Sequence, residues 1–86
     1  MSEVTIYRTS WCPFCQRAEA LLAGKSIAQL DVIDIDERPD ARPTMIELAG
    51  GKTSVPQIFI NGAHIGGCDD LHDLERTGEL DKMLAG

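Results

Sequence analysis

Two cysteines that enclose a proline and a phenylalanine, Cys12-Pro13-Phe14-Cys15, are the residues of this chain best suited to do chemistry. A thiolate attacks a disulfide sulfur, and a second thiol nearby can then displace the product. The chain has three cysteines among 86 residues and no signal-peptide pattern, so we expect a cytoplasmic protein in a reducing compartment. There, a Cys-x-x-Cys pair is more often catalytic or metal-binding than structural.

The pair falls where a predicted strand gives way to a predicted helix. Residues 4–7 are β-rich, and residues 16–23 are strong helix formers. Pro13 is favoured at the first helical position, which makes Cys12 the N-cap. An N-cap side chain accepts backbone N–H bonds and meets the positive end of the helix dipole, and both effects favour a thiolate. We therefore predict that Cys12 attacks, whereas Cys15, on the core face, stays protonated and resolves the mixed disulfide.

The elements that must position these thiols follow from the remaining periodicity. A strand is expected at 30–35, followed by a helix at 41–49 with Asp40 at its N-cap. Two strands, at 57–60 and 63–65, are joined by Asn61-Gly62. A helix capped by Asp69 or Asp70 and a last turn at 80–84 complete the chain. The order β-α-β-α-β-β-α predicts one α/β domain over 1–86. Its first two strands should be parallel and its last two antiparallel, in a four-stranded mixed sheet flanked by three helices.

Two further segments suit a ligand. Pro56 follows Val55 at the start of a strand, where a cis bond would turn the Val55 backbone outward, although a trans proline that simply begins the strand is the alternative. Gly66-Gly67-Cys68-Asp69-Asp70 leads into a helix whose first N–H groups can bind a carboxylate, with Asp69 placed for an ammonium group. The alternative for this segment is a flexible turn with an N-cap.

Other functions are disfavoured by composition and spacing. The net charge of −6 argues against nucleic acid, and no apolar run approaches the roughly 20 residues of a membrane span. A zinc site would need further ligands beside the cysteine pair, and the candidates are Cys68, His64 and His72. These residues lie on a hairpin and at a helix start, which need not converge on the cysteine pair, so we expect no metal. A pair of incidental buried cysteines is the remaining alternative.

Three segments, in this order, resemble the glutaredoxin family, in particular the bacterial dithiol glutaredoxins of the glutaredoxin 3-like type: Cys12-Pro13-Phe14-Cys15, Thr53-Ser54-Val55-Pro56-Gln57-Ile58-Phe59-Ile60 and Gly66-Gly67-Cys68-Asp69-Asp70. The resemblance implies a thioredoxin fold, a cis bond before Pro56 and glutathione as co-substrate, with no tightly bound cofactor. It implies glutathione contacts at Phe14, Thr53, Ser54, Val55, Pro56, Gly67, Cys68 and Asp69.

The chain departs from the family pattern around the first cysteine. The usual tyrosine of the motif is Phe14, Trp11 precedes Cys12, and Thr9 stands where the family usually has a basic residue. The candidates for binding the glycyl carboxylate of glutathione are therefore Arg8, Arg42 and Lys52.

The activity implied is a glutathione-dependent thiol–disulfide oxidoreductase that reduces protein–glutathione mixed disulfides and protein disulfides. The partners implied are glutathione, glutathionylated proteins and protein disulfides, with ribonucleotide reductase among the family's substrates, and we expect a monomer. Two alternatives stay open, an electron donor recharged by thioredoxin reductase and a carrier of a glutathione-ligated iron–sulfur cluster.

Overall fold

The computed structural model describes residues 2–85. Its elements are β1 (Glu3–Arg8), α1 (Pro13–Ala23), β2 (Gln29–Asp34), α2 (Ala41–Leu48), β3 (Gln57–Ile60), β4 (Ala63–Gly66), α3 (Cys68–Thr77) and α4 (Glu79–Ala85). The sheet has four strands in the order β2-β1-β3-β4. β1 is parallel to β2 and antiparallel to β3, and β4 is antiparallel to β3. The predicted mixed sheet and strand directions are confirmed.

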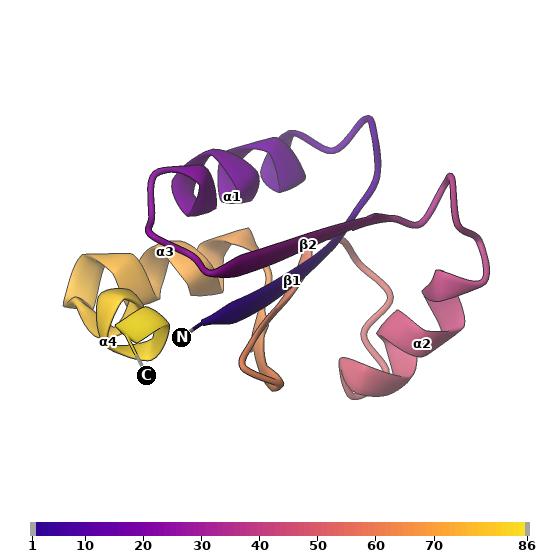
Figure 1. Cartoon of the computed structure of the whole chain (residues 1–86). Coiled ribbons are helices and arrows are strands. Elements are labelled where there is room, and N and C mark those ends of the chain that lie inside the picture. The colour runs from indigo at the N-terminus through magenta and orange to yellow at the C-terminus, as the bar shows by residue number, and fades with distance from the viewer. Residues whose placement is uncertain (1, 86) are drawn as a thin grey trace.

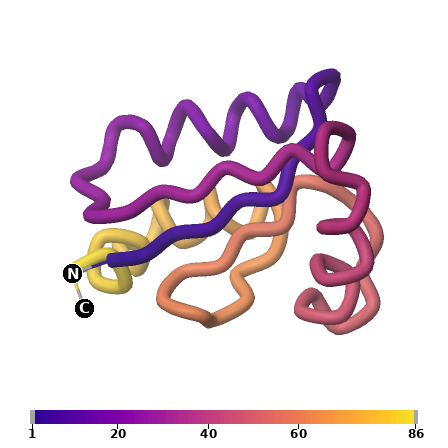
Figure 2. The backbone as a smooth tube through the Cα atoms, turned by 45° about the vertical axis from the view of Figure 1, so that its right-hand side comes forward, coloured from indigo at the N-terminus to yellow at the C-terminus, as the bar shows by residue number. Residues whose placement is uncertain are grey.

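The sheet separates two hydrophobic cores because strand side chains alternate between its faces. The larger core joins Val4 and Ile6 of β1 to apolar residues of β3, α1, α3 and α4. The smaller one joins Tyr7 and Phe59 to Met45 of α2. Figure 1 shows α1 and α3 on one side of the sheet and α2 on the other. In Figure 2 the chain leaves β1, returns through α1 and runs beside β1 as β2.

Turn chemistry fixes the second half of the sheet. Asn61 and Gly62 both have positive φ angles, 51° and 84°, as a tight hairpin between antiparallel strands requires. The Asn61 side chain also accepts a bond from the Glu3 N–H at 2.8 Å. This contact ties the hairpin to the start of β1.

Of the predictions about helix starts and lengths, one was confirmed and two were wrong. Asp40 is the N-cap of α2, as predicted, although it has helical backbone angles and its side chain makes no capping bond. The N-cap of α3 is Gly67 rather than Asp69 or Asp70; Asp70 instead accepts the Gly67 N–H at 3.0 Å. The expected last turn is the seven-residue helix α4, because Leu80 and Leu84 are one turn apart and both reach the larger core.

Several strand and helix boundaries differ from prediction by one residue: β1 is Glu3–Arg8, β2 is Gln29–Asp34, α2 ends at Leu48, and β4 ends at Gly66. Within residues 2–85 no helix combines the length and apolarity needed to cross a membrane.

Candidate active site

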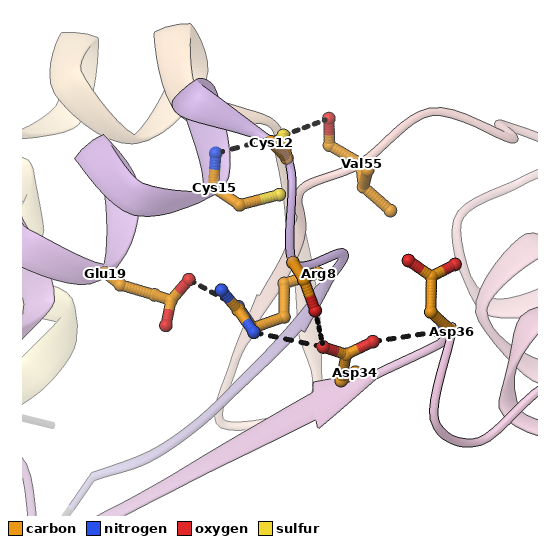
Figure 3. Close-up of polar contacts among 8 residues, drawn as sticks. Arg8, Cys12, Cys15, Glu19, Asp34, Asp36 and Val55 are labelled. Atoms are coloured by element: carbon orange, nitrogen blue, oxygen red, sulfur yellow. Dashed lines mark hydrogen bonds and ion pairs between the residues drawn. The ribbon is translucent and has the colours of Figure 1, made fainter.

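Cys12 is the N-cap of α1, as predicted. Its backbone is extended, with φ −104° and ψ 105°, and its sulfur accepts a bond from the Cys15 N–H at 3.2 Å. The thiol also donates to the Val55 carbonyl at 3.7 Å (Figure 3). The sulfur therefore lies at the N-terminal end of α1, where a backbone N–H and the positive end of the helix dipole are directed at it.

Cys15 is held in a different environment one turn into the same helix. It has no exposed surface. Burial, followed by a hydrogen bond with Cys12, raises the pKa of Cys15 from 9.0 to about 12. Cys15 therefore stays a neutral thiol at neutral pH. All three cysteines of the chain are free thiols in this structure.

A groove of about 220 Å³ begins beside the Cys12 sulfur, at Val55. Its lining residues are Phe14, Lys52, Ser54, Val55, Pro56, Gln57, Gly67, Cys68, Asp69 and Asp70. Seven of the eight residues that the resemblance implied for glutathione are among them, the exception being Thr53. A larger hollow of about 310 Å³, between Tyr7, Leu48 and Phe59, lies on the α2 side of the sheet and has no cysteine in its lining.

The backbone at the two ends of this groove has unusual geometry. The peptide bond between Val55 and Pro56 is cis, as the resemblance implied. Gly66 has φ +120°, and a Cβ there would lie 2.3 Å from an Asp70 carboxylate oxygen. Only glycine fits this position, and the carboxylate that excludes a side chain is the one that holds the Gly67 N–H.

Of the three basic candidates, Lys52 alone lines the groove. The Arg42 guanidinium donates to the Thr53 carbonyl at 3.3 Å, which turns it toward the backbone outside the lining. Arg8 is paired with Glu19 at 2.7 Å and with Asp34 at 3.1 Å (Figure 3). Its guanidinium is thus engaged on the sheet side of α1.

Sequence reasoning missed two lining residues, Gln57 and Asp70. Gln57 is almost fully buried at the start of β3. It donates to the Ser54 carbonyl at 2.9 Å, and its amide oxygen pairs with the His64 ring at 2.7 Å. A polar residue in an otherwise apolar strand was the signal available for Gln57, because a buried amide must find such partners.

The ring and sulfur groups near Cys68 do not form a metal site. The Cys68 sulfur lies 3.4 Å from His72 Nδ1, but His64 is turned to Gln57. No cluster of three or more His, Cys, Asp or Glu suited to a metal is found in the part of the chain that the structure describes. Burial raises the pKa of the Cys68 thiol, and its side chain is part of the larger core.

The fold and the thiol pair together define a thiol–disulfide oxidoreductase of the thioredoxin fold. A sequence model of the family described as Glutaredoxin matches residues 4–65. The chain belongs to the glutaredoxin family.

Individual relatives agree over nearly the full length. The chain is 48% identical to a Pseudomonas aeruginosa protein named Glutaredoxin, over 99% of both chains. It is 46% identical to Glutaredoxin 3 of Escherichia coli strain K12, over 98% of this chain and 99% of that one. Among solved structures, the crystal structure of a buckwheat glutaredoxin–glutathione complex superposes with a TM-score of 0.86 at 28% identity, covering 98% of this chain and 77% of that chain.

Proposed function

We propose that this protein uses glutathione to reduce protein–glutathione mixed disulfides and protein disulfides, with Cys12 as nucleophile and Cys15 as resolving thiol. The observation that carries the proposal is the N-capping Cys12 sulfur beside a groove with backbone groups on both sides. Glutathione is a peptide-like ligand with two carboxylates and one ammonium group. The groove offers a partner for each of these features.

Each part of glutathione has a proposed partner in the lining. The cysteinyl part pairs with the Val55 backbone, as an extended peptide pairs with a strand edge. The γ-glutamyl carboxylate meets the Cys68 and Asp69 N–H groups at the start of α3, where helix dipole and free donors favour an anion. The Asp69 side chain takes the ammonium group, and Lys52 takes the glycyl carboxylate. A relative of the same fold was solved as a complex with glutathione, which supports this assignment.

The reaction proceeds by two thiol exchanges. The Cys12 thiolate attacks the glutathione sulfur of a mixed disulfide; the Cys12–glutathione bond forms, and the protein sulfur leaves as a thiolate that takes up a proton. A second glutathione thiolate then attacks the bound glutathione sulfur, which restores the Cys12 thiolate and releases glutathione disulfide. When the substrate is a protein disulfide, Cys15 displaces the product instead, and the Cys12–Cys15 disulfide forms.

The division of roles is tested by Cys15→Ser. This variant should keep deglutathionylation of a small mixed disulfide and lose reduction of protein disulfides, because only the second reaction needs a resolving thiol. Cys12→Ser, the matched control, should lose both. If folded Cys15→Ser loses both reactions as well, Cys12 does not act alone in deglutathionylation and the proposed roles are incorrect.

The same proposal extends to the location, the oligomeric state and the substrates of the protein. We propose a cytoplasmic monomer whose substrates are glutathionylated proteins and protein disulfides, with ribonucleotide reductase as one candidate. No cofactor or metal takes part in the steps above.

A further inference from the structure

An ion network on the sheet side of α1 lies next to the thiol pair but outside the groove. Arg8 donates through Nε to Glu19 at 2.7 Å and through Nη1 to Asp34 at 3.1 Å. The Asp34 carboxylate also accepts the Ser10 hydroxyl at 2.9 Å and backbone N–H groups of the loop that follows. The three charged side chains are only 11–27% exposed, so water screens them less than it screens a typical surface pair.

The ion network shares a face of α1 with Cys15. Glu19 follows Cys15 by four residues, which places both on one face of α1. Arg8 ends β1, and the backbone of the next residue, Thr9, acts to lower the pKa of Cys15. Figure 3 shows Arg8 reaching from its strand toward the helix turn that carries Cys15 and Glu19.

The charges in the network act on Cys15 in opposite senses. Burial is the main cause that raises the pKa of Cys15, and the negative charge of Glu19 adds to it. Burial opposes the charged form of Arg8, but Glu19, Asp34 and the Cys15 sulfur together raise the pKa of Arg8. Arg8 thus stays cationic and attracts a Cys15 thiolate, whereas Glu19 repels it.

We propose that Arg8, Glu19 and Asp34 are positioning residues that set how readily Cys15 releases its proton, and hence how fast a mixed disulfide at Cys12 is resolved. The consequence for resolution rests on the proposed function, because it takes Cys15 as the resolving thiol. The effect on Cys15 protonation does not depend on glutathione. The two parts can therefore be tested separately.

The step that the network governs is balanced without another reactant. The Cys15 thiol loses its proton to water, and its thiolate attacks the Cys12 sulfur of the mixed disulfide. The Cys12–Cys15 bond forms as the bond from Cys12 to the partner sulfur breaks. The partner leaves as a thiolate and takes up a proton, so that Cys15 is oxidised and the partner sulfur is reduced.

The titratable groups around Cys15 come from every neighbouring element. They are Cys12 and Glu19 of α1, Arg8 of β1 and, through Arg8, Asp34 of β2. The segment before β3 contributes the uncharged Val55 carbonyl against Cys12, and Cys68 of α3 interacts with Cys12. Two cations are present: Arg17 of α1 acts on Cys68, whereas Arg8 interacts with Cys15 itself, which makes removal of Arg8 a sharp test.

Two substitutions that each remove one charge of the 2.7 Å Arg8–Glu19 ion pair should have opposite effects. Glu19→Gln removes a repelling charge, so Cys15 should become a thiolate at lower pH. Arg8→Met removes the attracting charge and leaves two carboxylates unneutralised, so Cys15 should become a thiolate at higher pH. If the network only held the helix against the sheet, both substitutions would loosen that contact, and both would shift the reactivity of Cys15 in the same direction.

The test measures alkylation of Cys15 by iodoacetamide from pH 7 to 9 in a Cys12→Ser background, with the modified peptide identified by mass. At each pH we expect Glu19→Gln to react roughly threefold faster and Arg8→Met roughly threefold slower than the parent, a displacement of about half a pH unit each way. Arg8→Lys, which keeps the charge, should restore most of the rate.

A second ion network supplies the matched control. Lys25 pairs with Glu75 at 2.7 Å and with Asp81 at 2.9 Å, away from the thiols. Lys25→Met should leave Cys15 alkylation unchanged. The proposal is overturned if Glu19→Gln and Arg8→Met shift the rate in the same direction, in the reverse order, or not at all.

A second measurement uses intact Cys12. Reduced protein is mixed with glutathione disulfide, quenched with acid and weighed by mass spectrometry, and the ratio of internal disulfide to mixed disulfide is followed over time. Glu19→Gln should raise this ratio and Arg8→Met should lower it; unchanged ratios overturn the link to resolution. A wild-type protein that forms no glutathione adduct contradicts the proposed function instead, and the alkylation series still decides the charge effect.

Discussion

Cys12 and Cys15 are three residues apart, yet their surroundings differ in the property that matters for exchange. The Cys12 sulfur lies at the helix start with one backbone N–H directed at it. Cys15 is enclosed, and burial raises its pKa to about 12. Exchange needs a thiolate to attack and a second thiol that does not compete until the first has reacted. The helix supplies this asymmetry from one short motif.

The high pKa of Cys15 predicts a pH dependence of stability. Above about pH 9 an unfolded chain releases the Cys15 proton while the folded protein keeps it until about pH 12. The folded state then binds more protons, so the free energy of unfolding falls as pH rises through this window, by at most about 1.4 kcal/mol per pH unit. Urea unfolding of the reduced protein at pH 8 to 10.5 measures the slope.

Cys15→Ala is the comparison for this slope. It will be less stable at every pH because a buried sulfur is lost, but its stability should fall less steeply above pH 9. Equal slopes for the two proteins would show that Cys15 titrates normally in the folded state.

Lys52 is the basic residue best placed to meet a ligand in the groove. It lines the groove, whereas Arg8 and Arg42 are engaged elsewhere. Because an exposed ion pair contributes about 0.2–1 kcal/mol, Lys52→Gln should raise KM for a glutathione mixed disulfide up to about fivefold with little change in kcat. The difference should shrink at high salt.

Lys82→Gln on α4 removes the same charge far from the groove lining and should leave KM unchanged. If the two variants behave alike, the effect comes from net charge and the glycyl carboxylate has another partner.

At the scale of elements, sheet topology explains why three separate segments meet. The cysteine motif follows the end of β1, Val55-Pro56 precedes the start of β3, and the glycine turn follows the end of β4. Since β3 runs antiparallel to both neighbours, all three points fall at the same end of the sheet. Strand directions alone therefore assemble the site.

The turn between β4 and α3 depends on Gly66. Gly66→Ala must adopt φ +120° and place its Cβ against the Asp70 carboxylate, which releases the Gly67 N–H from its 3.0 Å bond. We expect a loss of about 1–3 kcal/mol in the free energy of unfolding and a higher KM for glutathione. Thermal unfolding and steady-state kinetics measure the two effects.

Gly78→Ala provides the matched control, because Gly78 has φ +82° but open space around its Cβ position. It should cost about 1 kcal/mol without changing KM. A Gly66→Ala protein with unchanged KM would show that the turn geometry is not needed for glutathione.

At the scale of the whole molecule, local patterns predicted most of the architecture. Strand alternation, the Asn61-Gly62 hairpin and Pro13 at a helix start were sufficient for the sheet and for Cys12 at the N-cap. The N-cap of α3 was predicted at Asp69 or Asp70 rather than at Gly67, because several polar residues near a helix start compete and tertiary contacts decide among them. The length of α4 was missed because a helix of seven residues is marginal on its own, and Leu80 and Leu84 hold it against the larger core.

The Arg8 network was beyond sequence reasoning for a different reason. Its members come from three elements, at positions 8, 19 and 34, and only the β1–β2 register places Arg8 opposite Asp34. Nothing local to any of these residues predicts the contact. The partners of Gln57 likewise come from two segments, Ser54 before β3 and His64 of β4.

The most direct test of the central claim mixes reduced Cys15→Ser protein with a glutathionylated peptide and weighs the intact protein before any second thiol is added. If the groove presents the glutathione sulfur to Cys12, the protein should gain one glutathionyl group on Cys12 and release the free peptide. Added glutathione should then remove the adduct. A peptide attached to Cys12, an adduct on Cys68, or no adduct in the folded protein would contradict the proposal.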